Sequence, residues 1–433
     1  MSQQQTGHRK LTDGLNVAIV GGSITACATA TLLSRAGAVV SVFERSSGNL
    51  EDRGVGLAMK ISTLEALAER ALIDADMPHV PVWHRTFARA HDGPSPDGTP
   101  WQVYWEQPVA FRANHWGVLF RSLRQRVPDE IYYQGHEVTG FEEQPNGSID
   151  LQFANQPARN FDLVIFADGY ESVGRRILRP DCSTEANRYF LWRGMIDEWV
   201  LPMPERYADT ITYFGYEFGH GFVYYVPSPD PEHGSTPGKR RLNWAFHETV
   251  AGKTIPGIKS DEDGYVRQGL RPGAASDAQI AYCRAMAREY FPPFFGDVVA
   301  ATDQPFIQPV VDACVPSYTQ GRVCLIGDAA TLTRPHIGGG AGKALDDAMA
   351  LADLLATRDT LDGALAAWDE TRSAFGSELF DVGRSMGEHL VEATPDWDSM
   401  DHVSMERWWQ GVIGDRYWFW VAEVADKHPL FNA

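Results

Sequence analysis

Residues 16–26, NVAIVGGSITA, decide the fold of this chain. The apolar run Asn16–Val20 predicts a strand, two glycines follow it, and the small residues of Thr25–Ala36 predict a helix. A second apolar run, Val39–Phe43, completes a βαβ unit of about 30 residues. In such a unit the amino end of the helix lies beside the glycine turn, where free backbone amides can hold a pyrophosphate.

The turn itself predicts a dinucleotide site. Gly21 and Gly22 allow a tight turn, whereas Ser23 and Ala26 stand where the G-x-G-x-x-G pattern has its second and third glycines. Glu44 lies at the end of the second strand, where a carboxylate can accept hydrogen bonds from ribose hydroxyls. Taken alone, the same turn would also fit another βαβ fold.

Two further apolar runs end in acidic turns. Residues 162–169, DLVIFADG, place Asp168 and Gly169 after one strand, and residues 321–330, GRVCLIGDAA, place Asp328 after another. In open α/β sheets ligands bind at this carboxyl edge, so Asp328 is predicted to hold a hydroxylated chain such as the ribityl group of FAD. A cluster before the next helix is predicted to face the isoalloxazine ring: Pro335, Gly338, Gly339, Gly340, Ala341 and Gly342.

Residues 182–310 differ in character from the rest. They are rich in aromatic residues and contain short alternating segments at Tyr189–Ile196, Thr210–Tyr216 and Leu242–Val250, which predict a mostly antiparallel sheet. Two polar stretches, 91–100 and 227–238, predict loops, and the second lies between the strand-like segments Phe222–Val226 and Arg241–Phe246. The predicted fold class is therefore α/β, a Rossmann-like FAD-binding domain interrupted by an antiparallel β-sheet substrate domain, with C-terminal helices. The expected segments are 1–80, 110–181 and 311–390 for the FAD-binding domain, 81–109 and 182–310 for the substrate domain, and 391–433 for a helical tail.

The composition restricts the partners. A formal net charge of −19 over 433 residues argues against nucleic-acid binding, because phosphates would be repelled. The sequence has no run of 18 or more apolar residues, so no membrane span is expected. The five cysteines are scattered without a C-x-x-C pair, which favours reduced thiols and a cytoplasmic location.

The three strand-end patterns, in this order, resemble the class A flavoprotein monooxygenases, which share the fold of p-hydroxybenzoate hydroxylase. The resemblance extends from about Leu15 to Leu390. Finer details resemble the 2,6-dihydroxypyridine 3-hydroxylase branch, and pyridinol-tailoring hydroxylases of natural-product pathways, such as that of piericidin biosynthesis, are similar in kind. Those details are Trp192-Arg193-Gly194, Leu242-Asn243-Trp244 and Arg334-Pro335-His336. Thr331 departs from the family pattern, because many relatives have histidine there.

The resemblance implies a reaction and further FAD contacts. NAD(P)H would reduce FAD, and O2 would give a C4a-hydroperoxyflavin that hydroxylates a small electron-rich aromatic, a phenol or a hydroxypyridine. Arg45, Arg53 and Arg112 would touch FAD, with Arg112 at the start of a helix that ends at Leu119. Asp168 and Gly169 would support both FAD and passing NAD(P)H. Residues that could meet a nicotinamide phosphate are Arg175, Arg176 and Lys343.

Candidates for substrate chemistry come from the inserted sheet, which covers the flavin in this fold. They are Arg193, Tyr224, Tyr225, Trp244 and His247, with His336 added because it adjoins the flavin-facing glycines. A base or hydrogen-bond acceptor near the ring hydroxyl would help the reaction. Each candidate also has a structural interpretation: the aromatics can be core, His247 a satisfied structural histidine, and Arg193 a partner of Asp197.

The end of the chain and the rival functions complete the expectations. Trp408, Trp409, Trp418 and Trp420 are expected to form an apolar helical face that docks on the core or on a second subunit, which would make a homo-oligomer. A halogenase would carry W-x-W-x-I-P, whereas here Val421 follows Trp420. A non-hydroxylating flavoprotein such as an oxidase, and a cofactor-binding pathway partner without turnover, remain alternatives.

Overall fold

The computed structural model describes residues 10–51, 55–90, 101–250, 255–259, 266 and 269–431. One layer of the molecule is a mainly parallel sheet of six strands in the order β16-β17-β10-β1-β2-β6. The strands are β1 Asn16–Val20, β2 Val39–Glu44, β6 Tyr132–Gln134, β10 Leu163–Phe166, β16 Thr319–Gln320 and β17 Val323–Leu325. Within it β1 pairs in parallel with both β2 and β10, so Val20, Phe43 and Phe166 lie in register.

The second sheet has nine strands in the order β18-β15-β11-β14-β13-β12-β4-β5-β3. Its strands are β3 Gly56–Met59, β4 Val80–Arg89, β5 Gln102–His115, β11 Glu185–Asp197, β12 Thr210–Tyr216, β13 Gly219–Val226, β14 Arg241–Thr249, β15 Phe306–Cys314 and β18 Thr331–Leu332. Neighbouring strands are antiparallel except for the parallel pair β4 and β12. The mostly antiparallel insertion predicted from the alternating aromatic segments is therefore confirmed.

Helices cover these sheets. The α-helices are α1 Ile24–Arg35, α2 Ile61–Glu69, α3 Trp116–Arg124, α4 Val173–Leu178, α5 Asp277–Tyr290, α6 Pro293–Ala300, α7 Gly340–Thr357, α8 Leu361–Gly387, α9 His402–Ile413, α10 Phe419–Ala422 and α11 Val424–Lys427. Shorter turns are η2 Asp129–Ile131, η3 Glu205–Tyr207, η4 Gly327–Ala329, η5 Pro335–Ile337, η6 Glu388–Glu392 and η7 Trp397–Ser399. A small antiparallel sheet is made of β7 Val138–Glu143, β8 Ile149–Phe153 and β9 Arg159–Phe161.

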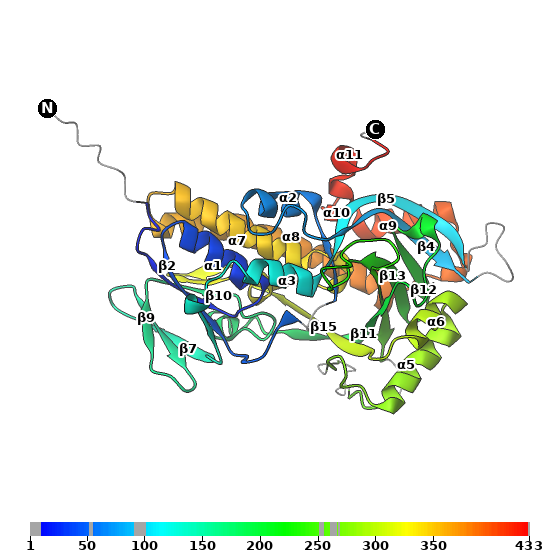
Figure 1. Ribbon diagram of the computed structural model, residues 1–433, viewed down its shortest axis with the longest axis horizontal. Coiled ribbons are helices and arrows are strands. Elements are labelled where there is room, and N and C mark those ends of the chain that lie inside the picture. Colours follow the sequence, from blue (N-terminus) through cyan, green and yellow to red (C-terminus); the bar gives the residue numbers. More distant parts are fainter. Residues whose placement is uncertain are drawn as a thin grey trace.

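Figure 1 shows the parallel sheet, with β2 and β10, toward one end of an elongated molecule and the antiparallel sheet, with β12 and β13, toward the other. Helices α7 and α8 run along the first sheet, and α5 and α6 lie outside the second. Each sheet has its own cluster of buried apolar side chains. The α/β class with a parallel sheet, an antiparallel sheet and C-terminal helices is confirmed.

Close packing explains the first βαβ unit. Every residue of α1 from Ile24 to Thr31 is buried, and their small side chains let the helix lie close to the sheet. Gly21 has a φ of +99°, and a Cβ there would lie 2.4 Å from the carbonyl oxygen of Ala167. The amide of Gly21 also donates to the carbonyl of Phe43 at 2.8 Å. The turn therefore requires glycine both for its backbone conformation and for the approach of β10.

Three expectations need correction or fall outside the described residues. Arg112 lies in β5, not on a helix, because β5 continues through His115 and pairs with both β3 and β4. The tryptophans of the tail do not share one helical face, since Trp408 and Trp409 lie on α9 and Trp418 precedes α10. The predicted loop 227–238 does join β13 to β14, whereas the predicted loop 91–100 lies outside the described residues.

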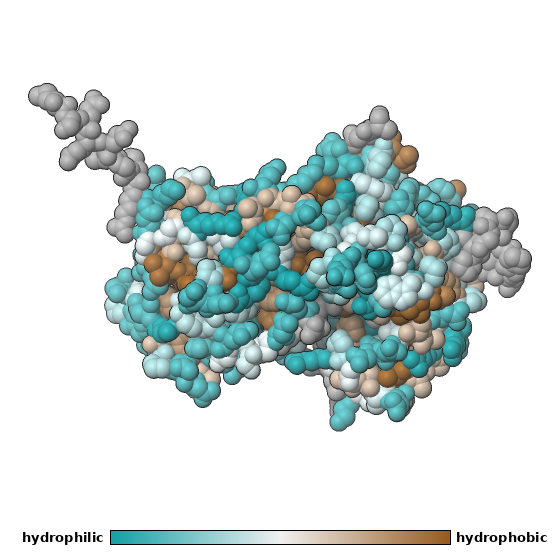
Figure 2. Space-filling model, in the orientation of Figure 1, coloured by the Kyte–Doolittle hydropathy of each residue, from teal (hydrophilic) through white to brown (hydrophobic). Residues whose placement is uncertain are grey.

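The tail packs on its own chain. Trp409, Trp418 and Trp420 are buried and belong to the core cluster of the antiparallel sheet. The face in Figure 2 is mainly hydrophilic, with apolar residues in small patches. The tail was expected to dock either on the core of its own chain or on a second subunit. The structure shows the tail docked on the core of its own chain. Among the helices that the structure describes, none is long and apolar enough to cross a membrane.

We predict that Gly21→Ala lowers the free energy of unfolding by at least about 2 kcal/mol, because it adds both backbone strain and overpacking against β10. Urea denaturation measures the change. Gly48→Ala is the matched control, because Gly48 has an unstrained φ and no atom within 4 Å of an added Cβ. Equal stability of the two variants would contradict the packing argument.

Candidate active site

Two cavities open along the carboxyl edge of the parallel sheet. The larger has a volume of about 920 Å³ and the smaller about 380 Å³. Four residues line both cavities, which makes them neighbours: Ser23, Trp116, Ala167 and Gly169. The site is therefore an elongated depression that runs from the glycine turn toward the antiparallel sheet.

The larger cavity begins at the glycine turn. Gly21, Gly22, Ser23 and Glu44 line it. The Glu44 carboxylate accepts hydrogen bonds from the amides of Gly22 and Ser46, both at 2.8 Å, which fixes its orientation at the end of β2. A carboxylate oxygen has more than one lone pair, so Glu44 can still accept from ribose hydroxyls. Ser23 makes no side-chain cap on α1, which leaves the first amides of that helix without a side-chain partner.

Asp168 and Gly169 lie where the two cavities meet. Oδ2 of Asp168 accepts from the amide of Val173 at 2.7 Å, whereas its buried Oδ1 has no partner among the described residues. Burial raises the pKa of Asp168 above its ordinary value. Gly169 has a φ of +77° and open space around a hypothetical Cβ, so glycine is required there by the backbone alone.

Arg175 ties the two acidic turns together. Its guanidinium donates to the carbonyls of Asp328 at 2.9 Å and Ala329 at 3.0 Å, in the turn after β17. The same group donates to the carbonyl of Tyr170 and to Thr184 Oγ1, beside the turn after β10. Arg175 therefore holds the turn of Asp168 and the turn of Asp328 in one arrangement.

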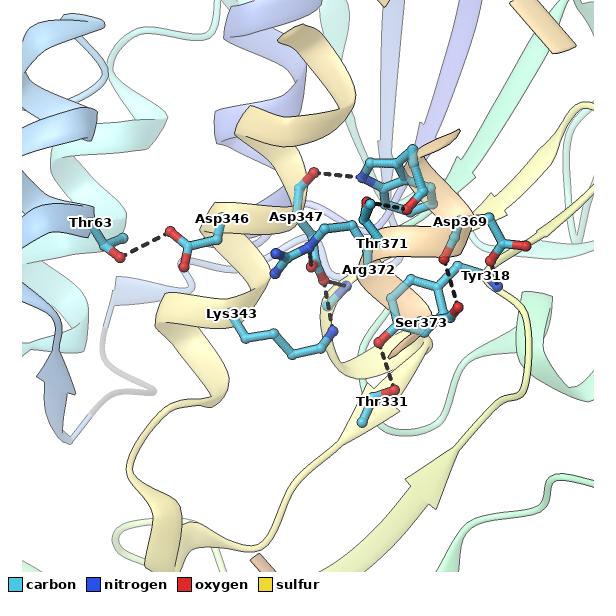
Figure 3. Close-up of polar contacts among 12 residues, drawn as sticks. Thr63, Tyr318, Thr331, Lys343, Asp346, Asp347, Asp369, Thr371, Arg372 and Ser373 are labelled. Carbon is cyan, nitrogen blue, oxygen red and sulfur yellow. Dashed lines mark hydrogen bonds and ion pairs between the residues drawn. The ribbon is translucent and has the colours of Figure 1, made fainter. Parts of the chain in front are cut away.

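A buried ion network supports the Asp328 turn from behind through the amide of Gly327. Figure 3 shows the Asp347 carboxylate bonded to Lys343 and to Arg372. The Asp347 carboxylate accepts from Lys343 Nζ at 2.7 Å, from Arg372 Nε at 2.6 Å and from the amide of Gly327 at 3.3 Å. Burial alone would lower the pKa of Lys343, but Asp347 outweighs it and raises that pKa. Lys343 is thus buried in an ion pair with Asp347 and is not available to a nicotinamide phosphate, so its predicted role as such a contact was wrong.

The glycine cluster contacts the tail of the chain. Gly338, Gly339, Gly340 and Ala341 line the smaller cavity, whereas Gly342 does not. A Cβ at Gly338 would lie 2.9 Å from the Trp420 ring, and one at Gly339 would lie 3.2 Å from the Phe419 ring. Two of these glycines are therefore needed for the docking of α10, in addition to any role of their amides toward a ligand.

A buried cation lies in the wall opposite the glycines. Arg193 donates to Gln308 Oε1 at 2.7 Å and to the carbonyl of Gly56 at 3.3 Å. Its Nε has no partner, and no ion pair joins Arg193 to any carboxylate among the described residues. Asp197 pairs instead with Arg241 at 2.9 Å, so the expected alternative of an Arg193–Asp197 pair is wrong. Tyr224 lines the same wall, and burial raises its pKa to about 12.

Three histidines gather beside this wall. His220 and His336 line the smaller cavity, and His247 packs behind them with its ring centroid 4.2 Å from that of His336. His336 Nε2 lies 2.9 Å from the hydroxyl of Tyr189. Burial is the main cause that lowers the pKa of each of the three below its ordinary range. The imidazoles are therefore neutral at physiological pH.

The remaining sequence candidates divide clearly. Arg45 lines the larger cavity and pairs with Glu171 at 3.2 Å, on the surface. Arg112 lines neither cavity, and its guanidinium stacks on Trp83, so the expected contact with FAD is not supported. Arg53 lies outside the described residues. Pro335 lines the smaller cavity, whereas Ala26 is buried inside α1 and lines neither. Two of the aromatic residues proposed from the sequence, Tyr225 and Trp244, are buried but line neither cavity.

Two lining residues were missed from the sequence. His220 shares a face of β13 with Phe222 and Tyr224, and all three line the smaller cavity. Alternation along β13 carries this signal, but the predicted strand began only at Phe222. Trp420 also lines the cavity, in addition to the expected docking of the tail on the core. No local pattern places α10 beside residues 338–339.

The residues at the two cavities fit FAD. The glycine turn with Glu44 suits an adenosine diphosphate, and Asp328 with the amides of residues 338–341 suits a ribityl chain and a flavin ring. The partnerless buried Oδ1 of Asp168 is a hydrogen-bond acceptor at the junction of the cavities, as a hydroxyl-rich ligand requires. A Cβ at Gly21 would meet the backbone of Ala167 and Asp168, so the turn that lines the larger cavity excludes a side chain at this position.

Comparison with known proteins agrees with this geometry. A family model described as "FAD binding domain-like" matches residues 186–312. The 2,6-dihydroxypyridine 3-monooxygenase of Paenarthrobacter nicotinovorans is 28% identical over 378 residues, which are 86% of this chain and 91% of that protein. The salicylate hydroxylase of Pseudomonas putida is 26% identical over 393 residues, covering 83% and 82% of the two chains.

A solved structure of 2,6-dihydroxypyridine-3-hydroxylase from Arthrobacter nicotinovorans superposes with a TM-score of 0.76 at 25% identity, covering 89% of this chain and 95% of that chain. The chain is thus similar, over most of its length, to FAD-dependent aromatic monooxygenases. Within that class it is similar, over most of both chains, to an enzyme that is named for a dihydroxypyridine.

We predict that Asp347→Asn lowers the free energy of unfolding by about 3–5 kcal/mol, because it leaves buried Lys343 without its counter-charge. The variant should also lose FAD on gel filtration, since Asn has only one acceptor oxygen and cannot accept both from Gly327 and Lys343 on one side and from Arg372 on the other. Asp353→Asn on the same helix is the control: its pair with Arg70 is largely exposed and should contribute about 1 kcal/mol or less. Similar losses for both variants would contradict the network.

A second prediction concerns acid stability. His115 caps α3 by accepting from the amide of Gly117 at 3.1 Å, and burial lowers its pKa to about 4. The unfolded chain binds a proton at its ordinary pKa and the folded chain does not, so stability falls as the pH drops from about 6.5 toward 4. Unfolding at pH 5 should cost about 2 kcal/mol less than at pH 7.5 through this residue. His115→Asn keeps a cap and should remove that part of the pH dependence; an unchanged profile would contradict the assignment.

Proposed function

We propose that this protein is an FAD-dependent monooxygenase that hydroxylates a small hydroxypyridine or phenol with NAD(P)H and O2. One observation carries the proposal. A single cavity is bounded by Asp328 and the glycines of residues 338–341 on one side and by Arg193, Tyr224 and neutral histidines on the other. A flavin ring and an electron-rich aromatic ring are thereby given facing sites. FAD, when bound, supplies the hydride chemistry and the activation of O2.

Arg193 is proposed to hold the oxygen of the ring. It is a buried cation without a carboxylate partner among the described residues, so an anionic oxygen would supply the missing counter-charge. A deprotonated ring hydroxyl is such an oxygen, and its negative charge makes the ring more nucleophilic. The free Nε of Arg193 provides a donor for it.

Tyr224 and His336 are proposed to complete the orientation of the ring. Tyr224 stays protonated because burial raises its pKa, so its hydroxyl donates a hydrogen bond. Nδ1 of His336 has no partner, and the neutral imidazole can accept the proton of a ring hydroxyl. His247 does not line the cavity and is proposed to act on the ring through His336, on which it stacks.

The aromatic walls exclude water. Phe111, Leu191, Phe222 and Trp420 line the cavity around its polar groups. A dry pocket strengthens the interaction of Arg193 with an anionic oxygen and suits a flat ring. We propose Trp420 as a wall that limits the size of the substrate.

Three wider expectations are kept as proposals. Segments 1–80, 110–181 and 311–390 would serve FAD, and segments 81–109 and 182–310 would serve the substrate. In the second sheet, β3 and β18 come from the first set, and β5 and β15 cross from one set to the other. A cytoplasmic location is proposed because all five cysteines are free. A role in natural-product biosynthesis, on a pyridinol, is proposed from the similarity to a dihydroxypyridine hydroxylase.

NAD(P)H oxidation by the FAD-loaded protein tests the proposal, with and without a panel of hydroxypyridines and phenols. We expect one ring class to accelerate oxidation and to yield a product with one more oxygen atom by mass spectrometry. Acceleration by an aliphatic or amine substrate alone would overturn the substrate class. A flavin-loaded protein that no ring stimulates would favour a binding partner without turnover.

We predict that Arg193→Gln lowers kcat/KM for the active ring by roughly 10- to 100-fold, the loss of one hydrogen bond to a charged group. Arg193→Lys keeps the charge and should recover part of the rate. Arg384→Gln, at an exposed position on α8, is the control. Steady-state kinetics with equal FAD content measure the effect, and an unchanged kcat/KM in Arg193→Gln would rule out the role.

A further inference from the structure

The three histidines of the antiparallel sheet form a compact cluster with its own geometry. His220 comes from β13, His247 from β14 and His336 from η5. One ring nitrogen from each can be chosen so that all three lie within 4.8 Å of one another. The side chains are 1%, 1% and 5% exposed, respectively. Three buried imidazoles are therefore grouped within reach of a single small ion, and two of them line the smaller cavity.

The hydrogen bonds around the cluster leave one nitrogen of each ring free to face that point. Nδ1 of His220 lies 3.3 Å from the carbonyl of Leu390, which leaves its Nε2. Nε2 of His336 lies 2.9 Å from the hydroxyl of Tyr189, and its buried Nδ1 has no partner. Neither nitrogen of His247 makes a hydrogen bond of good geometry among the described residues, although the backbone carbonyl of His220 lies close enough to act on the pKa of the ring. A ligating histidine typically has this pattern, with one nitrogen held from outside and the other turned to the metal.

We propose that His220, His247 and His336 bind a divalent transition-metal ion such as Zn2+. Nitrogen ligands suit Zn2+, and three protein ligands with an open fourth position form a recognised zinc geometry. Because His220 and His336 also line the smaller cavity, the fourth position of the ion faces that cavity. An anionic oxygen in the cavity could fill it.

The local charge and packing agree with this assignment. Burial keeps the three imidazoles neutral, which is the form that binds metal. Without a bound ion, the unpartnered nitrogens of His247 would lower the stability of the folded chain, because burial removes their hydrogen bonds to water. The rings of His247 and His336 are stacked 4.2 Å apart at 22° from parallel, and imidazole lone pairs lie in the ring plane, so binding requires one of the two rings to rotate out of the stack to aim both nitrogens at one ion.

Metal titration of the FAD-loaded full-length protein tests the proposal. After treatment with a chelator, calorimetry with Zn2+ should show one tight site per chain. Co2+ should give the visible absorption bands of a low-coordinate site in difference spectra against the metal-free holoprotein. His247→Gln should weaken Zn2+ binding by at least about 10-fold, and Tyr189→Phe, which removes the outer partner of His336, by about 10- to 100-fold.

Controls separate this site from others and from misfolding. His402→Gln, at an exposed position, should bind Zn2+ as the parent does. Each variant must keep its FAD content and its thermal transition, and His336→Gln replaces His247→Gln if the latter fails to fold. Zn2+ binding that is undetectable, or equal in the parent and in His247→Gln, would overturn the proposal. The two proposals both use Nδ1 of His336: with an ion bound there, His336 no longer accepts the proton of the ring hydroxyl. Ring-stimulated NAD(P)H oxidation by the metal-free holoprotein therefore tests the hydroxylase proposal separately from the metal titration.

Discussion

The bond network of Arg175 is the constraint on which the site depends. Two neighbouring parallel strands, β10 and β17, end in acidic turns at the same edge of the sheet, and nothing in the strand pairing alone fixes how those turns lie relative to each other. The guanidinium donates to the carbonyls of both turns and makes them one unit. Asp347 also fixes the turn after β17, because its carboxylate accepts a hydrogen bond from the amide of Gly327. The carboxylates of Asp168 and Asp328 are thus positioned by Arg175 and Asp347, neither of which lines the smaller cavity.

The antiparallel sheet and the tail then close the opposite side. Arg193 and Tyr224 come from neighbouring parts of that sheet, and α10 brings Trp420 over the glycines of residues 338–339. The glycines consequently have two duties: they expose backbone toward the cavity and leave space for the tail. The tail lies 80 residues beyond the glycines in the sequence. It is nevertheless part of the site, because α10 packs on Gly338 and Gly339 and Trp420 lines the cavity.

Local patterns were sufficient for the parallel sheet and its turns. The strand Asn16–Val20, the glycine turn and Glu44 at the end of β2 follow from short-range periodicity and from the backbone needs of Gly21. Arg112 was misplaced because strand pairing with both β3 and β4 extends β5 to His115, which no local pattern reveals. His220 was missed because the predicted strand started at Phe222, two residues after His220, whereas β13 starts at Gly219. Lys343 was misjudged because its partner Asp347 lies one helical turn away, inside the protein.

The central claim is that a ring held by Arg193 receives an oxygen atom from O2. Turnover under isotopically labelled O2, in unlabelled water with NAD(P)H and the ring that best stimulates oxidation, tests it most directly. The account predicts a product that carries one labelled oxygen atom on the ring. A ring product without label, or NAD(P)H consumption that yields only peroxide with every ring, would contradict it.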